Sequence, residues 1–171
     1  AREITEIITH LREAIAVAPQ PTKKWLHALI RFYKSGSVDD WRAFNIAWVQ
    51  DTDSVVDALN GFIEVYVDAR GQKGAWESVV SFLNAEKTEA IKRLAKEAQW
   101  FEDRMPWAEE FKKADVKGIT ARAISVIVET GDSGPITPIG INLPNEADIR
   151  ENYGSKSVNL SNVVEAYGLL S

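Results

Sequence analysis

Strands that lie far apart in the chain, with helical stretches between them, limit the possible folds of this sequence most. Alternating apolar and polar residues in GFIEVYVD (61–68) predict one strand, with Ile63, Val65 and Val67 on one face, and β-branched runs predict strands at 121–129 and 136–141. Strands this scattered can pair only across long connections. We therefore expect an α+β fold, predominantly helical, in which a few sequence-distant strands form part of a mixed sheet or barrel.

Helical periodicity covers most of the remaining chain. Apolar residues at helical spacing predict helices over 3–18 and 22–33, and Ser37 is placed to cap a third helix. The apolar positions within 76–104 predict one long helix, and a last helix is expected from about Ser157. The helical content should therefore exceed the strand content.

The chain is expected to be a single partial region, 1–171, of a larger protein, because it lacks an initiator methionine and stops within a helical pattern. Its predicted organisation is helical over 1–60, then strand, loop and helix start over 61–84. A long helix and a connection follow over 85–118, and strands with C-terminal helices occupy 119–171.

Composition excludes several classes of function. The formal net charge is -5 and no basic stripe is present, so nucleic acid is not an expected partner. No apolar run approaches the roughly 20 residues that a membrane span needs, and the first residues form an amphipathic helix, unlike a signal peptide. The chain has no cysteine, which fits a reducing compartment, and we expect a cytoplasmic protein.

Two motifs suggest chemistry that the rest of the sequence does not support. GDSGP (131–135) resembles the nucleophile loop of trypsin-like serine proteases, but a serine nucleophile needs a histidine base within reach. The two histidines, His10 and His27, lie in predicted helices far upstream and have no metal-ligand spacing. We therefore interpret GDSGP as a turn, which Gly, Asp and Ser commonly form.

Two pairs of polar residues are stronger candidates for a binding site. Glu64 and Tyr66 share one face of the predicted strand, where a carboxylate could bind an ammonium group and a phenol could donate to a carbonyl or oxyanion. They could also be a solvent-facing strand edge. In IGINLPN (139–145), Pro144 restricts the backbone between Asn142 and Asn145. These asparagines could hold a peptide, or form a strand end and a helix N-cap.

Three segments together resemble the zinc-dependent dipeptidyl peptidase III family. The segments are FIEVYVDARGQKGAWE (62–77), PW (106–107) and IGINLPNEADIRENYGSKSVNLSNV (139–163). The resemblance covers about residues 30–168 and places the chain upstream of that family's zinc motif. It implies part of a two-lobed peptidase that releases dipeptides from the N-termini of short peptides.

The resemblance also implies a role for individual residues. Glu64 matches a glutamate that helps bind the free amino terminus of the substrate, and Tyr66 matches a tyrosine that polarises the scissile carbonyl. Asn142 and Asn145 match asparagines that hold the amino terminus and the first backbone groups, and Glu77 matches an acid near the same end of the cleft. The chain departs from the family pattern in one respect: eukaryotic members have an arginine between the tyrosine and the aspartate that match Tyr66 and Asp68.

The zinc motifs of the family, HExxGH and EExxAD, are absent from the chain. The resemblance therefore implies zinc in the parent protein and none bound by this chain, which alone is expected to be inactive. The implied partners are a short peptide substrate and the remaining peptidase lobe with the zinc motif. Residues 85–118 are a candidate segment of that other lobe. The alternatives are a stand-alone, non-catalytic peptide-binding module, and a helical scaffold in which the candidate residues do not converge.

Overall fold

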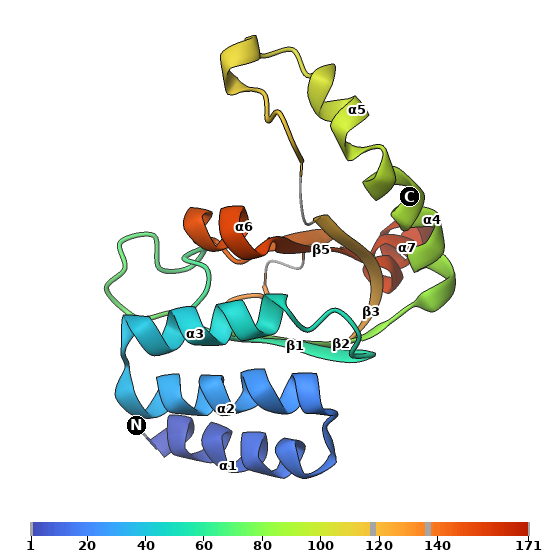
Figure 1. The fold of residues 1–171 in the computed structure, drawn as a ribbon. Coiled ribbons are helices and arrows are strands. Elements are labelled where there is room, and N and C mark those ends of the chain that lie inside the picture. The colour runs from blue at the N-terminus through green and yellow to red at the C-terminus, as the bar shows by residue number, and fades with distance from the viewer. Residues whose placement is uncertain (1, 117–118, 136–137, 171) are drawn as a thin grey trace. The chain divides into compact units, whose positions relative to one another are not determined.

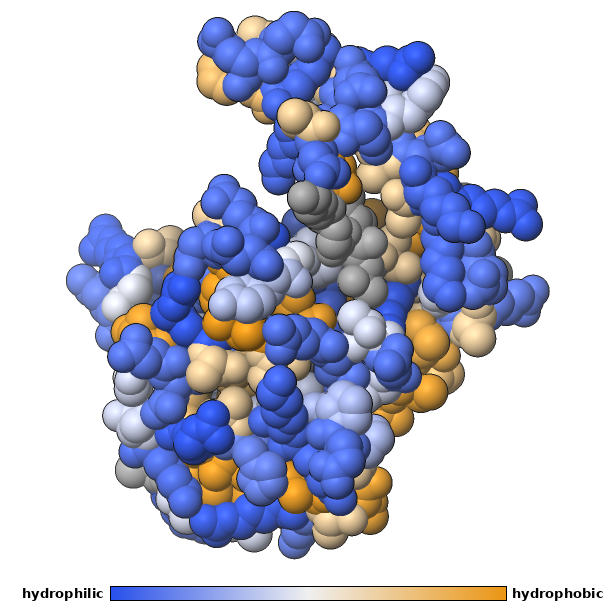
Figure 2. All heavy atoms as spheres, in the orientation of Figure 1, coloured by the Kyte–Doolittle hydropathy of each residue, from blue (hydrophilic) through white to orange (hydrophobic). Residues whose placement is uncertain are grey.

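The computed structural model describes residues 2–116, 119–135 and 138–170. The chain divides into two compact units, Ala1–Ser54 with Glu146–Tyr153, and Val55–Asn145 with Gly154–Ser171. We call them the helical unit and the sheet unit. Hydrophilic side chains cover most of the face shown in Figure 2, in keeping with a charged content of 26%. Within the described ranges, no helix is long and apolar enough to cross a membrane.

The helical unit consists of four helices. The first three are α1 (Arg2–Val17), α2 (Gln20–Ser35) and α3 (Val38–Val49), which confirm the helices predicted in this part of the sequence, and α6 (Ala147–Tyr153) completes the unit. α2 packs between α1 and α3 (Figure 1). The core side chains Trp25, Leu29, Phe44 and Trp48 are each at least 96% buried. Ser37 caps α3 as predicted, because its side chain accepts the N–H of Asp39 at 3.2 Å.

The sheet unit contains one mixed five-stranded sheet. Its strands are β1 (Val56–Gly61), β2 (Glu77–Leu83), β3 (Ile119–Gly131), β4 (Gly140–Leu143) and β5 (Ser155–Leu160). They are arranged in the order β1-β2-β3-β5-β4, with β3 and β5 parallel and the other neighbours antiparallel. Helices α4 (Ala85–Lys96) and α7 (Ser161–Leu170) pack against β3. The α+β class with sequence-distant strands is therefore confirmed.

A buried ion pair connects two strands that are not neighbours in the sheet. Lys156 on β5 is 2% exposed, and its Nζ lies 2.7 Å from Oδ2 of Asp57 on β1. Because β2 and β3 lie between these strands in the sheet order, the sheet must curl for the two side chains to meet. The curvature of β3 is visible in Figure 1. The curl brings the β1–β2 connection towards β4, where the candidate residues lie.

The strand predicted at 61–68 is wrong. β1 ends at Gly61, and residues 62–76 form the connection of a hairpin with β2. Val65 and Val67, predicted to share the aliphatic face of that strand, are 56% and 54% exposed. The alternating pattern is present, but distant carboxylates take up the backbone N–H groups that a neighbouring strand would otherwise bind.

The long helix predicted over 76–104 is also wrong in its first part. Residues 77–83 form β2, because Val79 and Val80 pair with Glu129 and Val128 of β3. Asn84 then caps α4 by accepting the N–H of Lys87 at 3.1 Å. The helical pattern breaks again at Glu97, after which α5 (Ala98–Asp103) and a short 3-10 helix (Glu109–Phe111) follow.

Two smaller corrections concern the end of the chain. The last helix begins at Ser161, and residues 155–160 form β5, whose pairing with both β3 and β4 overrides the helical pattern. The strand predicted at 121–129 lies within β3 and is confirmed. The strand predicted at 136–141 is shifted to 140–143; residues 136 and 137 lie outside the described part of the chain.

Candidate functional site

The connection 62–76 carries Glu64 and Tyr66, and the carboxylate of Asp68 organises its second half. Asp68 is 6% exposed and accepts the N–H groups of Gln72, Lys73 and Gly74 at 2.8–2.9 Å. Burial alone would raise the pKa of Asp68, but these three hydrogen bonds outweigh it and hold the pKa below its ordinary value. Asp68 therefore stays ionised and fixes the loop that follows Tyr66.

Glu77, at the start of β2, holds the first half of the connection. Its Oε1 accepts the N–H of Glu64 at 3.1 Å, and the side chain is 5% exposed. Burial raises the pKa of Glu77 to about 7, assisted by the charges of Glu64 and Asp132 and opposed by hydrogen bonds from Glu64 and Ser133. Glu77 therefore changes its charge near neutral pH.

The GDSGP segment is a turn, as predicted, and it lies beside the connection. A Cβ on Gly131 would lie 2.0 Å from the carbonyl oxygen of Trp76, so only glycine allows the two backbones to approach this closely. The N–H of Asp132 donates to that carbonyl at 2.9 Å, and Oδ1 of Asp132 accepts the N–H of Val67 at 3.2 Å. The turn therefore contributes to the position of Tyr66, a role that the sequence interpretation missed.

The second part of the site comes from β4 and the residues that follow it. Asn142 lies on β4, where its Oδ1 accepts the hydroxyl of Ser157 on β5 at 2.9 Å. Asn145 donates from Nδ2 to Oε1 of Glu64 at 3.2 Å and to the carbonyl of Ile63 at 3.4 Å. Helix α6 begins at Ala147, one residue later than an N-cap at Asn145 predicts. The amide of Asn145 thus joins β4 to the connection.

One pocket of about 180 Å³ brings the candidate residues together. Glu64, Tyr66, Glu77 and Asn142 line it, and Asn145 is hydrogen-bonded to one of these four. The remaining lining residues are mostly apolar strand residues, together with Ser133 of the turn: Leu59, Val79, Ser133, Pro138, Gly140, Ile141 and Leu143. The alternative in which the candidate residues do not converge therefore does not describe this structure.

Tyr66 presents a protonated phenol to this pocket. Partial burial raises its pKa above the ordinary value, and the negative charges of Glu64, Glu77 and Asp132 raise it further. The residue is 56% exposed and lines the pocket. At neutral pH the phenol keeps its proton, and it can therefore donate a hydrogen bond to a bound carbonyl.

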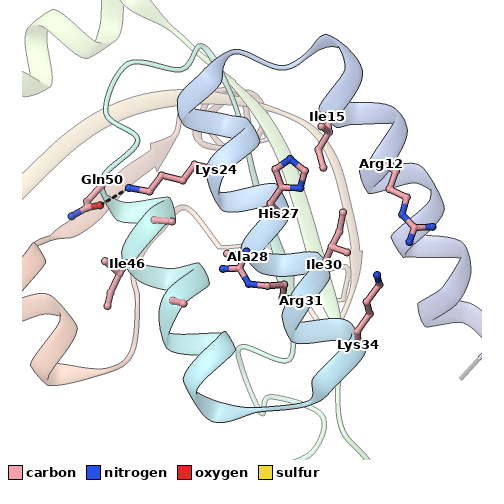
Figure 3. Close-up of a pocket in the computed structure, with 12 residues that line it drawn as sticks. Arg12, Ile15, Lys24, His27, Ala28, Ile30, Arg31, Lys34, Ile46 and Gln50 are labelled. Atoms are coloured by element: carbon pink, nitrogen blue, oxygen red, sulfur yellow. Dashed lines mark hydrogen bonds between the residues drawn. The ribbon is translucent and has the colours of Figure 1, made fainter.

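A second, larger groove lies in the helical unit and contains none of the predicted site residues. It measures about 980 Å³, and its ionised lining residues Arg12, Lys24, Arg31 and Lys34 are all basic (Figure 3). Lys24 reaches from α2 to Gln50, at 3.4 Å. His27 also lines this groove, and within the described residues no group of three or more His, Cys, Asp or Glu side chains could hold a metal ion.

The comparisons with known proteins identify the family. The family model described as Peptidase family M49 matches residues 1–168. The chain belongs to this peptidase family. Dipeptidyl peptidase 3 of Dictyostelium discoideum is 32% identical over 168 residues, which cover 96% of the chain and 24% of that relative. The M49 chain thus spans about a quarter of the length of the relatives it matches.

Solved structures of M49 relatives share the fold. Dipeptidyl-peptidase III from Corallococcus sp. strain EGB aligns with a TM-score of 0.79 and 27% identity, over 96% of this chain and 30% of that one. DPP III from Caldithrix abyssi aligns with a TM-score of 0.82 and 23% identity, over 95% of this chain and 31% of that one. The mixed sheet with its helices is therefore a recurring part of larger M49 structures.

Proposed function

We propose that this chain is the substrate-binding portion of a zinc-dependent dipeptidyl peptidase that releases dipeptides from the N-terminus of short peptides. Membership of peptidase family M49 supports a peptidase, and the convergence of Glu64, Tyr66 and Asn142 on one pocket supports a binding role. The convergence is the observation on which the proposal depends most. Glu64 and Asn142 come from segments that lie 78 residues apart in the sequence.

The pocket suits a free amino terminus. An α-ammonium group offers three N–H donors and one positive charge, and the carboxylate of Glu64 supplies the opposite charge. The amide oxygens of Asn142 and Asn145 supplement it as neutral acceptors. A peptide extended or acetylated at its N-terminus lacks the charge and the donors that these acceptors would bind, which lowers its affinity. This arrangement therefore recognises the free N-terminus of the substrate, which places the bond after its second residue for cleavage.

Tyr66 is assigned to the peptide bond that is cleaved. Its protonated hydroxyl donates to the scissile carbonyl oxygen and remains bonded as negative charge develops there. Within the described residues no group of three or more His, Cys, Asp or Glu side chains could hold a metal ion, and the sequence lacks the zinc motifs of the family. We propose that zinc, which would activate the attacking water, is held by the rest of the peptidase.

The binding proposal can be tested on the 171-residue chain by calorimetric titration with a tetrapeptide and with its N-acetylated form. We expect the free peptide to bind at least about tenfold more tightly, since the acetyl group removes the charge that Glu64 binds. Glu64→Gln should remove most of this difference. Glu89→Gln, which changes an exposed acid on α4, should leave it unchanged. Equal binding of the two peptides would refute the proposed role.

A second arm tests the division of labour between this chain and the rest of the peptidase. The chain alone, incubated with a dipeptidyl arylamide, should release no arylamine. Hydrolysis by the pure chain that a chelator abolishes would contradict the proposal. Binding of the free peptide without hydrolysis supports it.

A further inference from the structure

The turn at residues 131–134 is more than a connection between strands. Asp132 and Ser133 are 3% and 4% exposed, although they stand in a surface turn beside the sheet. A charged residue is seldom this buried unless it is bound to something. The buried carboxylate of Asp132 therefore needs an explanation in terms of what it contacts.

The partner of Asp132 is the backbone of the turn that carries Tyr66. The N–H of Asp68 donates to the carbonyl of Val65 at 3.1 Å, so Tyr66 and Val67 are the central residues of a tight turn. Oδ1 of Asp132 accepts the N–H of Val67 at 3.2 Å, the peptide group directly after Tyr66. The contact bridges 65 positions in the sequence, and the Val67 side chain itself is mostly exposed.

Asp132 is itself held rigidly. Its own N–H donates to the carbonyl of Trp76, and the close approach of Gly131 to the same carbonyl leaves no room for a side chain. The N–H of Gly134 closes the turn on the carbonyl of Gly131 at 3.2 Å. The backbone that carries the carboxylate is therefore fixed beside a connection that has no neighbouring strand at this point. Of the two oxygens, Oδ1 is hydrogen-bonded to Val67, whereas Oδ2 is buried with no hydrogen-bond partner among the described residues.

We propose that Asp132 is a positioning residue for Tyr66: by holding the Val67 N–H it fixes the direction in which the phenol points into the pocket. This proposal rests on the proposed function, because it takes from it the role of Tyr66 in the reaction. Glu77 and Asp68 hold the backbone on either side, at Glu64 and at 72–74. Asp132 is the carboxylate bound to the turn itself.

The first test measures amide hydrogen exchange in the 171-residue chain. Asp132→Ala removes the acceptor of the Val67 N–H. The Val67 amide should then exchange about tenfold faster, because the free energy that one hydrogen bond to a charged group contributes is enough for a change of that size. Asp132→Asn keeps a carbonyl oxygen in place and should restore most of the protection. Ser133→Ala, an equally buried neighbour in the same turn, should leave Val67 protected. Unchanged exchange in Asp132→Ala would overturn the proposal.

The second test is a double-mutant cycle in the full-length peptidase. Tyr66→Phe should lower kcat, and Asp132→Ala should lower kcat by about tenfold with little change in KM, because the residues that bind the amino terminus are unaltered. In the Tyr66→Phe background, Asp132→Ala should cause no further loss. A full additional loss means that Asp132 does not act through Tyr66, and overturns the proposal.

The two tests separate the two ideas. If Tyr66→Phe leaves kcat unchanged, the proposed role of Tyr66 in the reaction fails, while the exchange of the Val67 amide still decides whether Asp132 holds the turn. A global loss of stability in Asp132→Ala would speed exchange at many amides. The exchange rate of the Val79 amide, in the centre of β2, distinguishes the two cases. If Asp132→Ala speeds exchange at Val79 as much as at Val67, and Asp132→Asn does the same, the substitution destabilises the whole fold, and a specific positioning role is contradicted.

Discussion

The two parts of the pocket are built in different ways. Asn142 lies on a strand, its backbone is paired with β5, and its side chain is bound by a neutral hydroxyl. Glu64 and Tyr66 lie on a connection without strand partners, and carboxylates hold its backbone at Glu64, at Val67 and at 72–74. The strand part should therefore depend little on pH, whereas the connection depends on the ionisation of Glu77 and Asp68.

The difference also bears on the proposed roles. Asn142 is fixed by the pairing of its strand, whereas Glu64 and Tyr66 depend on the carboxylates that hold the connection. A hydrogen-bond donor stabilises a developing oxyanion most when it is already in position, so loss of these carboxylates should affect the proposed role of Tyr66 more than that of Asn142. Four changes to the chain test this contrast between the strand and the connection.

The largest expected effect comes from Tyr66→Phe in the full-length peptidase. Loss of the hydroxyl removes one donor to the developing oxyanion, which corresponds to a decrease in kcat of about 10²–10³-fold. KM for a dipeptidyl arylamide should change little. Tyr153→Phe is a matched control, because that tyrosine has similar exposure and lies on α6. A decrease in kcat below about threefold would show that the connection carries no reacting group.

Asp68→Ala should loosen the second half of the connection. The N–H groups of Gln72, Lys73 and Gly74 lose their common acceptor, so their amides should exchange more than tenfold faster while those of β2 stay protected. In the wild-type chain the pKa of Asp68 lies below its ordinary value, so this protection is present above pH 4 and is lost as the pH falls through the lowered pKa.

The control for Asp68 is Asp53→Ala, which removes an exposed carboxylate in the helical unit. It should leave the exchange of residues 72–74 unchanged. If the same three amides remain protected in Asp68→Ala, then the connection is held by other contacts and the contrast with β4 disappears.

Glu77→Gln should change how stability depends on pH. The folded pKa of about 7 is above the ordinary value of 4.5, so the folded wild type binds the proton more tightly and loses stability as the pH rises from about 4.5 to 7. Glutamine does not ionise, so the variant should gain about 2–3 kcal/mol relative to wild type at pH 8, and little at pH 4. Urea unfolding of both proteins at pH 4 and at pH 8 measures this difference in the free energy of unfolding.

Glu86→Gln, at an exposed position on α4, provides the comparison for Glu77. Its effect on the free energy of unfolding should be small and nearly the same at both pH values. A Glu77→Gln variant that behaves in the same way would show that the connection is no more sensitive to pH than the strand.

The smallest effect is expected on the strand side. Ser157→Ala removes one neutral hydrogen bond to Asn142, which corresponds to about 1 kcal/mol of stability with no dependence on pH between 5 and 8. A cycle with Asn142→Ala should give a coupling energy of similar size. Additive effects of the two substitutions, or a clear pH dependence, would contradict the assignment of a neutral contact.

The helical unit could be predicted from the sequence because its information is local. The periodicity of apolar residues and the cap at Ser37 specify α1, α2 and α3 without reference to other parts of the chain. The hairpin of β1 and β2 could not be found in this way. Its pattern at 77–83 fits a helix as well as a strand, and only pairing with residues 124–131 decides between them. The cap at Asn84 was the local signal that a new element starts there.

The candidate site was predictable in part. Glu64, Tyr66, Glu77 and Asn142 were selected from the sequence and its family resemblance, and they line one pocket, although the strand expected to align Glu64 with Tyr66 is absent. Asp132 was missed, because its partner lies 65 positions away and no periodicity reports such a contact. The glycines at 71 and 74 after Asp68 were the available sign of a loop organised by a side chain.

The close approach at Gly131 has a consequence for genetic screens of this protein. A library that replaces every residue and selects for peptide binding would rank Gly131 with Glu64 and Asn142, because any added carbon meets the Trp76 carbonyl and displaces the turn. The same library would tolerate most changes at Val67, whose side chain is exposed and whose contribution is made by its backbone alone. Such a screen would thus overlook Val67, whose backbone contact holds the turn beside the pocket, and highlight Gly131, which does not line the pocket.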